Sequence, residues 1–225
     1  MRDVYHDELA DIGKTLVQIA HMVASSMERA TDALLDADLA SAERVISDDQ
    51  EVDALRASIE ERTFRLVAQQ QPVATDLRVL VSGLHLVADL ERMGDLALHV
   101  AKVARMRYPE VAVPDELRDV ISQMGTVALS LVHKVADVID GRDVSLAQEI
   151  EIEDDSMDAL HRKLFTLLLS PNWAYGVESA IDMALLGRYY ERYADHAVSV
   201  ARRVIFIVTG QMPEPINSAP IAPSN

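Results

Sequence analysis

Four acidic pairs with one spacing recur along the chain, and in each pair an Asp or Glu is followed four positions later by an Asp. The eight residues are Asp49/Asp53, Glu91/Asp95, Asp154/Asp158 and Glu191/Asp195. Residues four apart are neighbours on one face of a helix, where two like charges destabilise the isolated helix by roughly 0.2–0.5 kcal/mol. Hard cations such as Mg²⁺, Mn²⁺ and Ca²⁺ take several carboxylate oxygens as ligands. We therefore take all eight residues as candidate metal ligands.

A single acidic pair on a helix more often marks a solvated face, so metal binding is favoured here only because the pair recurs. Three histidines, His99, His161 and His196, lie within four residues of these pairs. Imidazole beside carboxylate would extend the choice of metal to Fe and Zn. Each histidine taken alone is still more often an ordinary surface residue. Arg92 and Arg192 have a plain structural alternative as partners of nearby acids.

The acidic pairs occupy matched places in an internal repeat. The stretch DLERMGDLALHVAK at 89–102 resembles YYERYADHAVSVAR at 189–202, and both contain Glu-Arg-x-x-Asp. A second match pairs DQEVDAL at 49–55 with DDSMDAL at 154–160. A repeat of about 100 residues is too long for a solenoid unit, so it indicates duplication of a larger bundle.

Prolines, glycines and capping residues divide the chain into six predicted helices. We expect them near residues 2–36, 39–70, 72–107, 114–140, 144–169 and 175–210, with Gly141 capping the fourth. Apolar residues recur at helical spacing, and an aromatic content of 4% with eight glycines favours helices packed on helices. Short connections make neighbouring helices antiparallel. The predicted fold class is therefore all-α.

The repeat predicts two three-helix bundles, residues 1–108 and 112–210, followed by a disordered tail over 211–225. The tail contains several prolines and no periodicity. The two bundles are not identical in the repeated stretch, because Ser199 occupies the place that matches His99. We expect the two acidic sites to differ for the same reason.

Helix geometry predicts where the acidic pairs point. With about 100° per residue, Glu91 and Asp95 fall roughly opposite the apolar stripe that contains Leu90, Met93 and Ala97. We therefore expect the pairs of the third and sixth helices on the outer face of each bundle. The pairs of the second and fifth helices flank an apolar stripe, so the two pairs of each bundle are expected to form one acidic surface patch.

Composition excludes several classes of protein. The 225 residues carry a formal net charge of −16, which disfavours nucleic-acid binding through a basic face. There is no cysteine, so disulfides and thiolate metal sites are excluded. No signal peptide and no run of 18 apolar residues is visible, and we expect a cytoplasmic location without membrane insertion. No phosphate-binding glycine loop and no nucleophile motif occurs, so we expect no enzyme activity.

Two segments resemble the signature segments of the PhoU family, accessory and regulatory proteins of phosphate transport. They are QQPVATDLRVLVSGLHLVADLERMGDLALHVA at 70–101 and GRYYERYADHAVSVAR at 187–202. The resemblance extends over residues 1 to about 210, and actinobacterial members look most similar. It implies two three-helix bundles related by a pseudo-twofold axis. It also implies mono- or multinuclear sites of Mg, Mn, Fe or Zn, carried over by motif position to the eight residues Glu91, Asp95, Glu191, Asp195, Asp49, Asp53, Asp154 and Asp158.

The resemblance further implies a negative regulator of the phosphate-starvation response. Such a protein couples the phosphate ABC transporter, through its ATPase subunit, to a sensor histidine kinase. A homodimer stays open at this point. Two other functions remain as alternatives: a ferritin-like metal-binding or metal-dependent oxidase protein, and a helical scaffold whose acidic faces dock basic partners without metal.

Overall fold

The computed structural model describes residues 2–213, with side chains from Tyr5 onward, and within this range it contains six α-helices and no strand. The all-α prediction is confirmed. The helices are α1 (Arg2–Asp36), α2 (Leu39–Gln70), α3 (Ala74–Arg107), α4 (Asp115–Gly141), α5 (Val144–Leu168) and α6 (Gly176–Thr209). Each lies within about two residues of its predicted range. The predicted tail falls almost entirely outside the described residues.

Side-chain and left-handed caps set several of these boundaries. The Asp38 carboxylate accepts a hydrogen bond from the Ser41 backbone N–H at 3.1 Å, and Asp143 accepts from Ser145 at 2.8 Å. These caps satisfy donors that the first turn of a helix leaves unpaired. The predicted glycine cap of α4 is wrong by one residue: α4 continues through Gly141, and Arg142 takes the left-handed conformation with φ 51°. Its N–H bonds the Val138 carbonyl, which satisfies the helix end.

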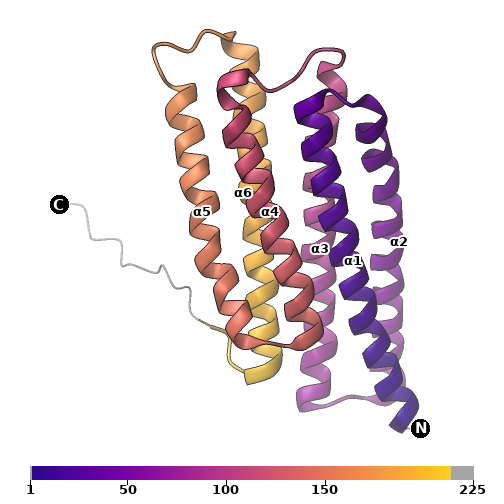
Figure 1. The fold of residues 1–225 in the computed structure, drawn as a ribbon. Coiled ribbons are helices and arrows are strands. Elements are labelled where there is room, and N and C mark those ends of the chain that lie inside the picture. Colours follow the sequence, from indigo (N-terminus) through magenta and orange to yellow (C-terminus); the bar gives the residue numbers. More distant parts are fainter. Residues whose placement is uncertain (1, 214–225) are drawn as a thin grey trace, which may run out of the picture.

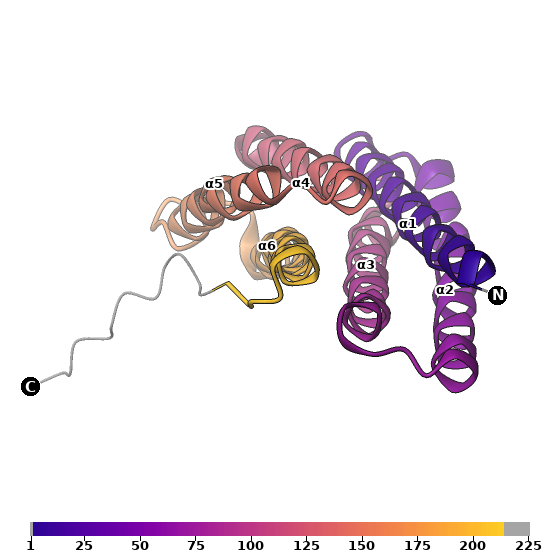
Figure 2. The same ribbon diagram turned by 90° about the horizontal axis from the view of Figure 1, so that it is seen from below.

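The six helices form two groups of three that lie side by side (Figure 1). Helices α1, α2 and α3 pack on one another, and so do α4, α5 and α6. Seen from below, α1 lies against α4 and α3 lies against α6, with α2 and α5 at the two outer ends (Figure 2). Because α3 and α6 run in opposite directions, residues of equal place in the repeat meet around the middle of this pair.

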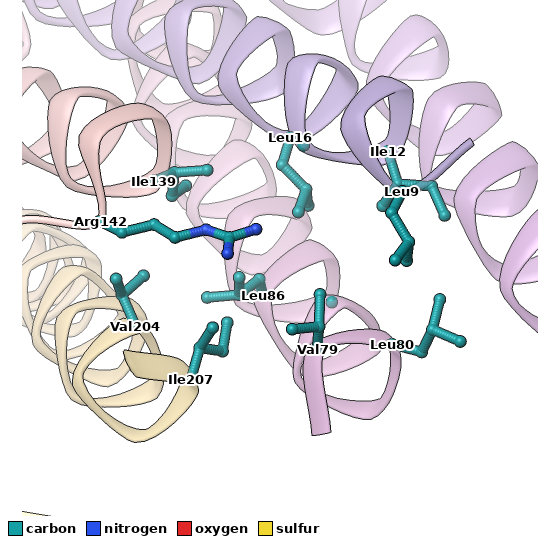
Figure 3. Close-up of a pocket in the computed structure, with 12 residues that line it drawn as sticks. Leu9, Ile12, Leu16, Val79, Leu80, Leu86, Ile139, Arg142, Val204 and Ile207 are labelled. Carbon is teal, nitrogen blue, oxygen red and sulfur yellow. The ribbon is translucent and has the colours of Figure 1, made fainter. Parts of the chain in front are cut away.

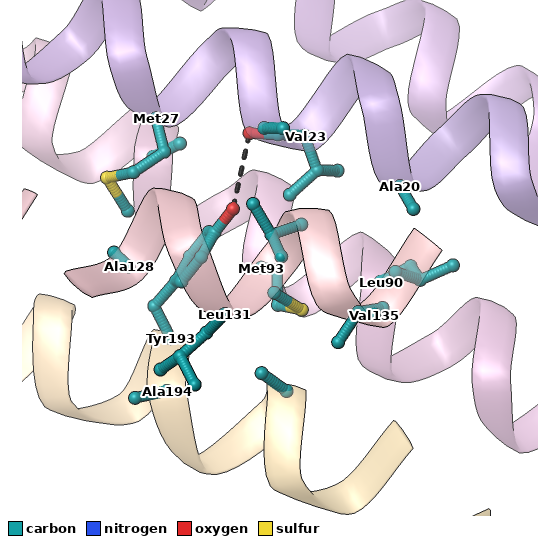
Figure 4. Close-up of a cluster of buried hydrophobic side chains, with 14 of the residues drawn as sticks. Ala20, Val23, Met27, Leu90, Met93, Ala128, Leu131, Val135, Tyr193 and Ala194 are labelled. Atoms are coloured by element: carbon teal, nitrogen blue, oxygen red, sulfur yellow. Dashed lines mark hydrogen bonds between the residues drawn. The ribbon is translucent and has the colours of Figure 1, made fainter. Parts of the chain in front are cut away.

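The hydrophobic core runs through both groups as one cluster. At its centre α1, α3, α4 and α6 meet around Met93, Leu131 and Tyr193, all fully buried (Figure 4). The Tyr193 hydroxyl donates to the Val23 carbonyl of α1 at 3.4 Å, so a polar contact joins the two groups inside the core. The predicted division into units at 108 and 112 falls in the α3–α4 loop. That each unit is a separate domain stays a prediction, because the core is shared.

An apolar pocket opens at the lower end of the contact between the groups (Figure 3). Aliphatic side chains of α1, α3 and α6 line it, including Leu16, Leu86 and Val204, and Arg142 extends into it from the end of α4. Its volume is only about 40 Å³, whereas pockets for small molecules usually reach about 300 Å³ or more. We therefore interpret it as a packing gap.

Within residues 2–213, every helix falls short of the combined length and apolar character that crossing a bilayer requires.

Candidate functional site

The acidic pairs of α2 and α3 come together between those two helices. A Cβ added to Gly94 would lie 3.5 Å from Asp49 Oδ1, so Asp49 of α2 faces α3 at the level of its Glu-Arg-x-x-Asp motif. The side chain of Glu91 is only 12% exposed, and Asp95 is half-buried. Asp53, one turn after Asp49, completes a group of four carboxylates that we call quartet 1 (Asp49, Asp53, Glu91, Asp95).

The predicted outward direction is therefore wrong for Glu91, which points into the α2–α3 contact. Asp95 keeps more of its exposure, at 30%, and also lines a pocket at the α3–α6 contact. The angular position of these residues around α3, at about 100° per residue, shows only that they lie away from its main apolar stripe. Helix α2 covers that second face, with Val52 and Ile59 buried against the bundle, and Leu98 of α3 is buried on the same face. The prediction that the pairs of two neighbouring helices form one acidic group is confirmed.

Partial burial and the crowding of like charges raise the pKa of carboxylates in quartet 1. Partial burial, and then the charges of Asp95, Asp53 and Glu91, raise the pKa of Asp49 to about 6, against a weaker opposing effect of Lys102. Partial burial and Asp95 also raise the pKa of Glu91, although Arg92 and Arg56 oppose the change. The protein thus holds carboxylates close together at a cost in free energy that a bound cation would relieve.

The second copy repeats this arrangement between α5 and α6. We call Asp154, Asp158, Glu191 and Asp195 quartet 2. Partial burial raises the pKa of Asp154 to about 6, with further contributions from Asp158, Asp195, Asp155 and Glu191. The Glu191 side chain is 17% exposed. All eight predicted residues therefore belong to two matched groups, one per copy.

Arginines neutralise part of each quartet. In quartet 1, Arg56 Nη1 donates to Glu91 Oε1 at 3.2 Å, and Arg92 Nη1 donates to Asp95 Oδ2 at 2.7 Å. The structural role that the sequence suggested for Arg92 is thus confirmed. In quartet 2, Arg188 of the same helix donates to Glu191. The first copy has Ala88 at the place of Arg188. The arginines that pair with the two quartets therefore come from different positions of the repeat.

The histidines near the motifs take different places from those expected. His161 on α5 matches Arg56 in the repeat, and its ring lies against α6, with Nε2 3.7 Å from the position of a Gly187 Cβ. That buried Nε2 has no hydrogen-bond partner within the described residues. His99 and His196 lie outside both quartets, where α3 meets α6. His99 Nδ1 contacts the backbone carbonyl of Asp95, whereas His161 lies beside quartet 2 on α5.

Within residues 2–213, no three or more His, Asp or Glu side chains converge as a set of metal ligands. The quartets gather carboxylates on shared surfaces, but their oxygens are not arranged around one point. Hard oxygen donors in this number match the chemistry of a divalent cation. Metal binding by the eight residues therefore stays a prediction.

A second polar site lies between α3 and α6, and the sequence did not single it out. A pocket of about 350 Å³ is lined by Arg92, Asp95, Leu96, His99, Tyr189, Arg192 and His196. Two contacts cross it: His196 Nδ1 lies 3.0 Å from Asp89 Oδ1, and the rings of His99 and Tyr189 are 5.2 Å apart. The antiparallel packing of the repeated helices could have indicated it, because that packing brings both copies of Glu-Arg-x-x-Asp to one seam.

Fold and sites together define a duplicated three-helix protein that carries one acidic quartet per copy. The PhoU domain family matches the chain twice, at residues 16–104 and 121–204, and the chain belongs to this family. A protein of Mycobacterium tuberculosis called phosphate-specific transport system accessory protein PhoU homolog 2 is 50% identical over 213 residues, covering 95% of this chain and 100% of the relative. Homolog 1 of Mycobacterium leprae is 48% identical over 214 residues, covering 95% of this chain and 96% of the relative.

Solved structures agree with this assignment. The crystal structure of PhoU from Pseudomonas aeruginosa has a TM-score of 0.81 and 27% identity, and the match covers 92% of this chain and 100% of that one. The phosphate transport system regulatory protein PhoU from Streptococcus pneumoniae shares the fold with a TM-score of 0.81 at 24% identity, covering 93% and 99%. The predicted resemblance is confirmed, including its actinobacterial leaning. The ferritin-like alternative finds no support among these relatives.

Proposed function

We propose that this protein is an accessory protein of phosphate-specific transport and a negative regulator of the phosphate-starvation response. The observation that carries the proposal is 50% identity, over the full length of the relative, to a phosphate-specific transport system accessory protein. The site chemistry supports a regulator better than an enzyme. The quartets contain no nucleophile with an adjacent base, and arginines already pair with several of their carboxylates.

The partners proposed are the ATPase subunit of the phosphate ABC transporter and a sensor histidine kinase. The family resemblance supports both, and it also supports a cytoplasmic location. A net charge of −16 favours docking on basic protein surfaces and disfavours nucleic acid. Exposed apolar side chains on α3 and α6, such as Val81 at 43% and Ile181 at 54%, give a mixed surface that suits a protein partner. A homodimer is a further arrangement that this surface permits.

We also propose that each quartet holds a divalent or transition cation, Mg, Mn, Fe or Zn. The raised pKa of Asp49 and that of Asp154 support this idea. Partial burial and then the neighbouring carboxylates disfavour the charged forms, and a bound cation would favour them. Such an ion supplies positive charge that ties α2 to α3 and α5 to α6. Asp49 and Asp154 then act as the residues that join each outer helix to the acidic motif of its neighbour.

Deletion of the gene tests the regulatory function. Transcription of phosphate-regulated genes is measured in high phosphate with and without the protein, and expression of the wild-type chain serves as the complemented control. The proposal expects loss of repression in the deletion strain and its return on complementation. Unchanged repression in the deletion strain would remove the regulatory role. Pull-down from phosphate-rich cells then identifies whether the ATPase subunit and a histidine kinase are retained.

A further inference from the structure

Two arginines from matched positions of the repeat line the pocket of about 350 Å³ between α3 and α6, which we call the seam pocket. Arg92 comes from α3 and Arg192 from α6, and both side chains are exposed. Among the side chains that the structure describes, the Arg192 guanidinium has no ion-pair or hydrogen-bond partner. A guanidinium that lines a pocket without a protein partner is available to a ligand.

Arg92 is also available, although it has partners. Its guanidinium bonds Asp95 at 2.7 Å and approaches Glu91 at 3.7 Å, but its side chain is 63% exposed. Exposed ion pairs contribute little to stability because water competes with both partners. The fork of N–H donors in a guanidinium can therefore turn toward a ligand at little cost while it keeps one acid in contact.

Two histidines also line the pocket, and both are oriented by the protein. His99 Nδ1 lies 2.6 Å from the Asp95 backbone carbonyl, so this nitrogen carries the hydrogen that it donates. His196 Nδ1 is held by Asp89 in the same way. In each ring Nε2 is then the nitrogen left for a ligand.

We propose that this pocket binds a tetrahedral oxyanion, with inorganic phosphate as the ligand. Two guanidiniums in one pocket match an anion with several acceptor oxygens, while a cation would meet repulsion from both arginines. Asp89 and Asp95 line or border the pocket, but each already accepts a hydrogen bond or ion pair from its neighbours. The preference for phosphate over other oxyanions rests on the proposed function, whereas the oxyanion class rests on the pocket alone.

The test uses the full-length protein, freed of metal with EDTA so that a metal-bound phosphate is not counted. Inorganic phosphate is titrated in a chloride buffer and followed by calorimetry and by ³¹P line broadening. Saturable binding of one phosphate per chain is expected. Arg192→Gln and Arg92→Gln should each weaken binding about tenfold or more, because each removes a charge-assisted hydrogen bond.

Arg105→Gln is the matched control, since Arg105 is an exposed arginine on α3 outside the pocket and the charge change is the same. Its phosphate affinity should equal that of the wild type, and circular dichroism confirms that all variants are folded. Equal losses in Arg105→Gln and Arg192→Gln would overturn the proposal, because they would show only unspecific attraction of anions. Sulfate in place of phosphate measures the selectivity.

Absence of saturable binding with phosphate, sulfate and phenyl phosphate would also overturn it. Binding of phenyl phosphate without binding of free phosphate would keep the oxyanion site, and would assign its ligand to a phosphoryl group on a larger molecule. None of these results changes the outcome of the deletion experiment. The regulatory function can therefore stand while the phosphate site fails.

Discussion

The Tyr190 hydroxyl on α6 lies 2.8 Å from Thr31 Oγ1 on α1, and this contact joins the two halves of the molecule inside the core. Thr31 Oγ1 donates to the Met27 carbonyl of its own helix at 2.8 Å, so Tyr190 is the donor and Thr31 the acceptor. Burial raises the pKa of the Tyr190 phenol above its ordinary value, which keeps the hydroxyl protonated. The matched residue of the first copy is Leu90, so the repeat is not symmetric here.

Removal of this hydroxyl should destabilise the fold. We expect Tyr190→Phe to lower the free energy of unfolding by about 1 kcal/mol, because Thr31 loses a donor in a site that water does not reach. Urea denaturation followed by circular dichroism measures the change. Tyr189→Phe is the control, since that side chain is only half-buried at the seam pocket. Equal stability of Tyr190→Phe and wild type would show that the contact contributes nothing.

Two glycines should respond to alanine in opposite directions. A Cβ at Gly125 of α4 would lie 2.6 Å from the methyl group of Thr31. The Thr31 side chain cannot easily turn away, because two hydrogen bonds hold its hydroxyl. We expect Gly125→Ala to cost about 1–3 kcal/mol through overpacking. At Gly94 of α3 the nearest atom would be 3.5 Å away, which is an ordinary contact.

Gly94→Ala should therefore stabilise the protein by up to about 1 kcal/mol, the difference in helix propensity between the two residues. Thermal unfolding of both variants beside the wild type checks the pair. Loss of stability in Gly94→Ala would contradict the prediction, because it would show that a methyl group does not fit between α3 and α2.

The stability of the metal-free protein should depend on pH through Asp49 and Asp154. Each has a folded pKa of about 6 against an ordinary value of 3.8, so the folded state binds the proton more tightly than the unfolded state. The contribution of these two residues to stability is then most favourable near pH 4, falls as pH rises toward 6, and stays lower above that. Both residues are partly exposed, which screens the effect.

Asp49→Asn should therefore stabilise the metal-free protein at pH 7 by about 1 kcal/mol, after allowance for solvent screening. The difference from wild type should close near pH 4. Asp137→Asn is the control, an exposed aspartate on α4 with the same change in charge. Urea unfolding at several pH values provides the measurement. The same gain at pH 4 and pH 7 would contradict the assignment of the raised pKa to Asp49.

Cation binding should distinguish the two quartets. In quartet 1, Arg56 donates to Glu91 from the neighbouring helix, and the matched place in quartet 2 is His161. Arg56→Gln should therefore strengthen Mn²⁺ binding at quartet 1 roughly tenfold, because a nearby positive charge is removed. Arg44→Gln, an exposed arginine at the start of α2, is the matched control.

Elemental analysis of protein loaded with Mn²⁺ tests the sites themselves. Asp49→Asn should remove one site, and the double variant with Asp154→Asn should remove both. Unchanged metal content in the double variant, or none in the wild type, would reject the quartets as metal sites. In that case the acidic faces would serve only to dock partners.

Much of the fold could be predicted from the chain because its signals are local. Prolines, caps such as Asp38 and Asp143, and apolar spacing mark where helices begin and end, and these depend on neighbouring residues. The repeat also indicated which acidic pairs would meet, since Asp49 and Asp154 occupy matched places. The left-handed cap of α4 was assigned to Gly141 because glycine most often adopts that conformation. That Arg142 adopts it instead is visible only in the structure.

The sequence by itself determined the six helices, their duplication, and the eight acidic residues that form two groups. Only the tertiary structure decided where these residues point. Helix α2 covers the face of α3 that lies opposite the main apolar stripe of α3. Glu91 lies on this covered face and is therefore nearly buried. Because α3 and α6 pack antiparallel, His99 and His196 lie in a pocket with Arg92 and Arg192 and are not part of the quartets. A helix's own periodicity shows which residues share a face, but the neighbour that covers that face is chosen by packing between residues far apart in the chain.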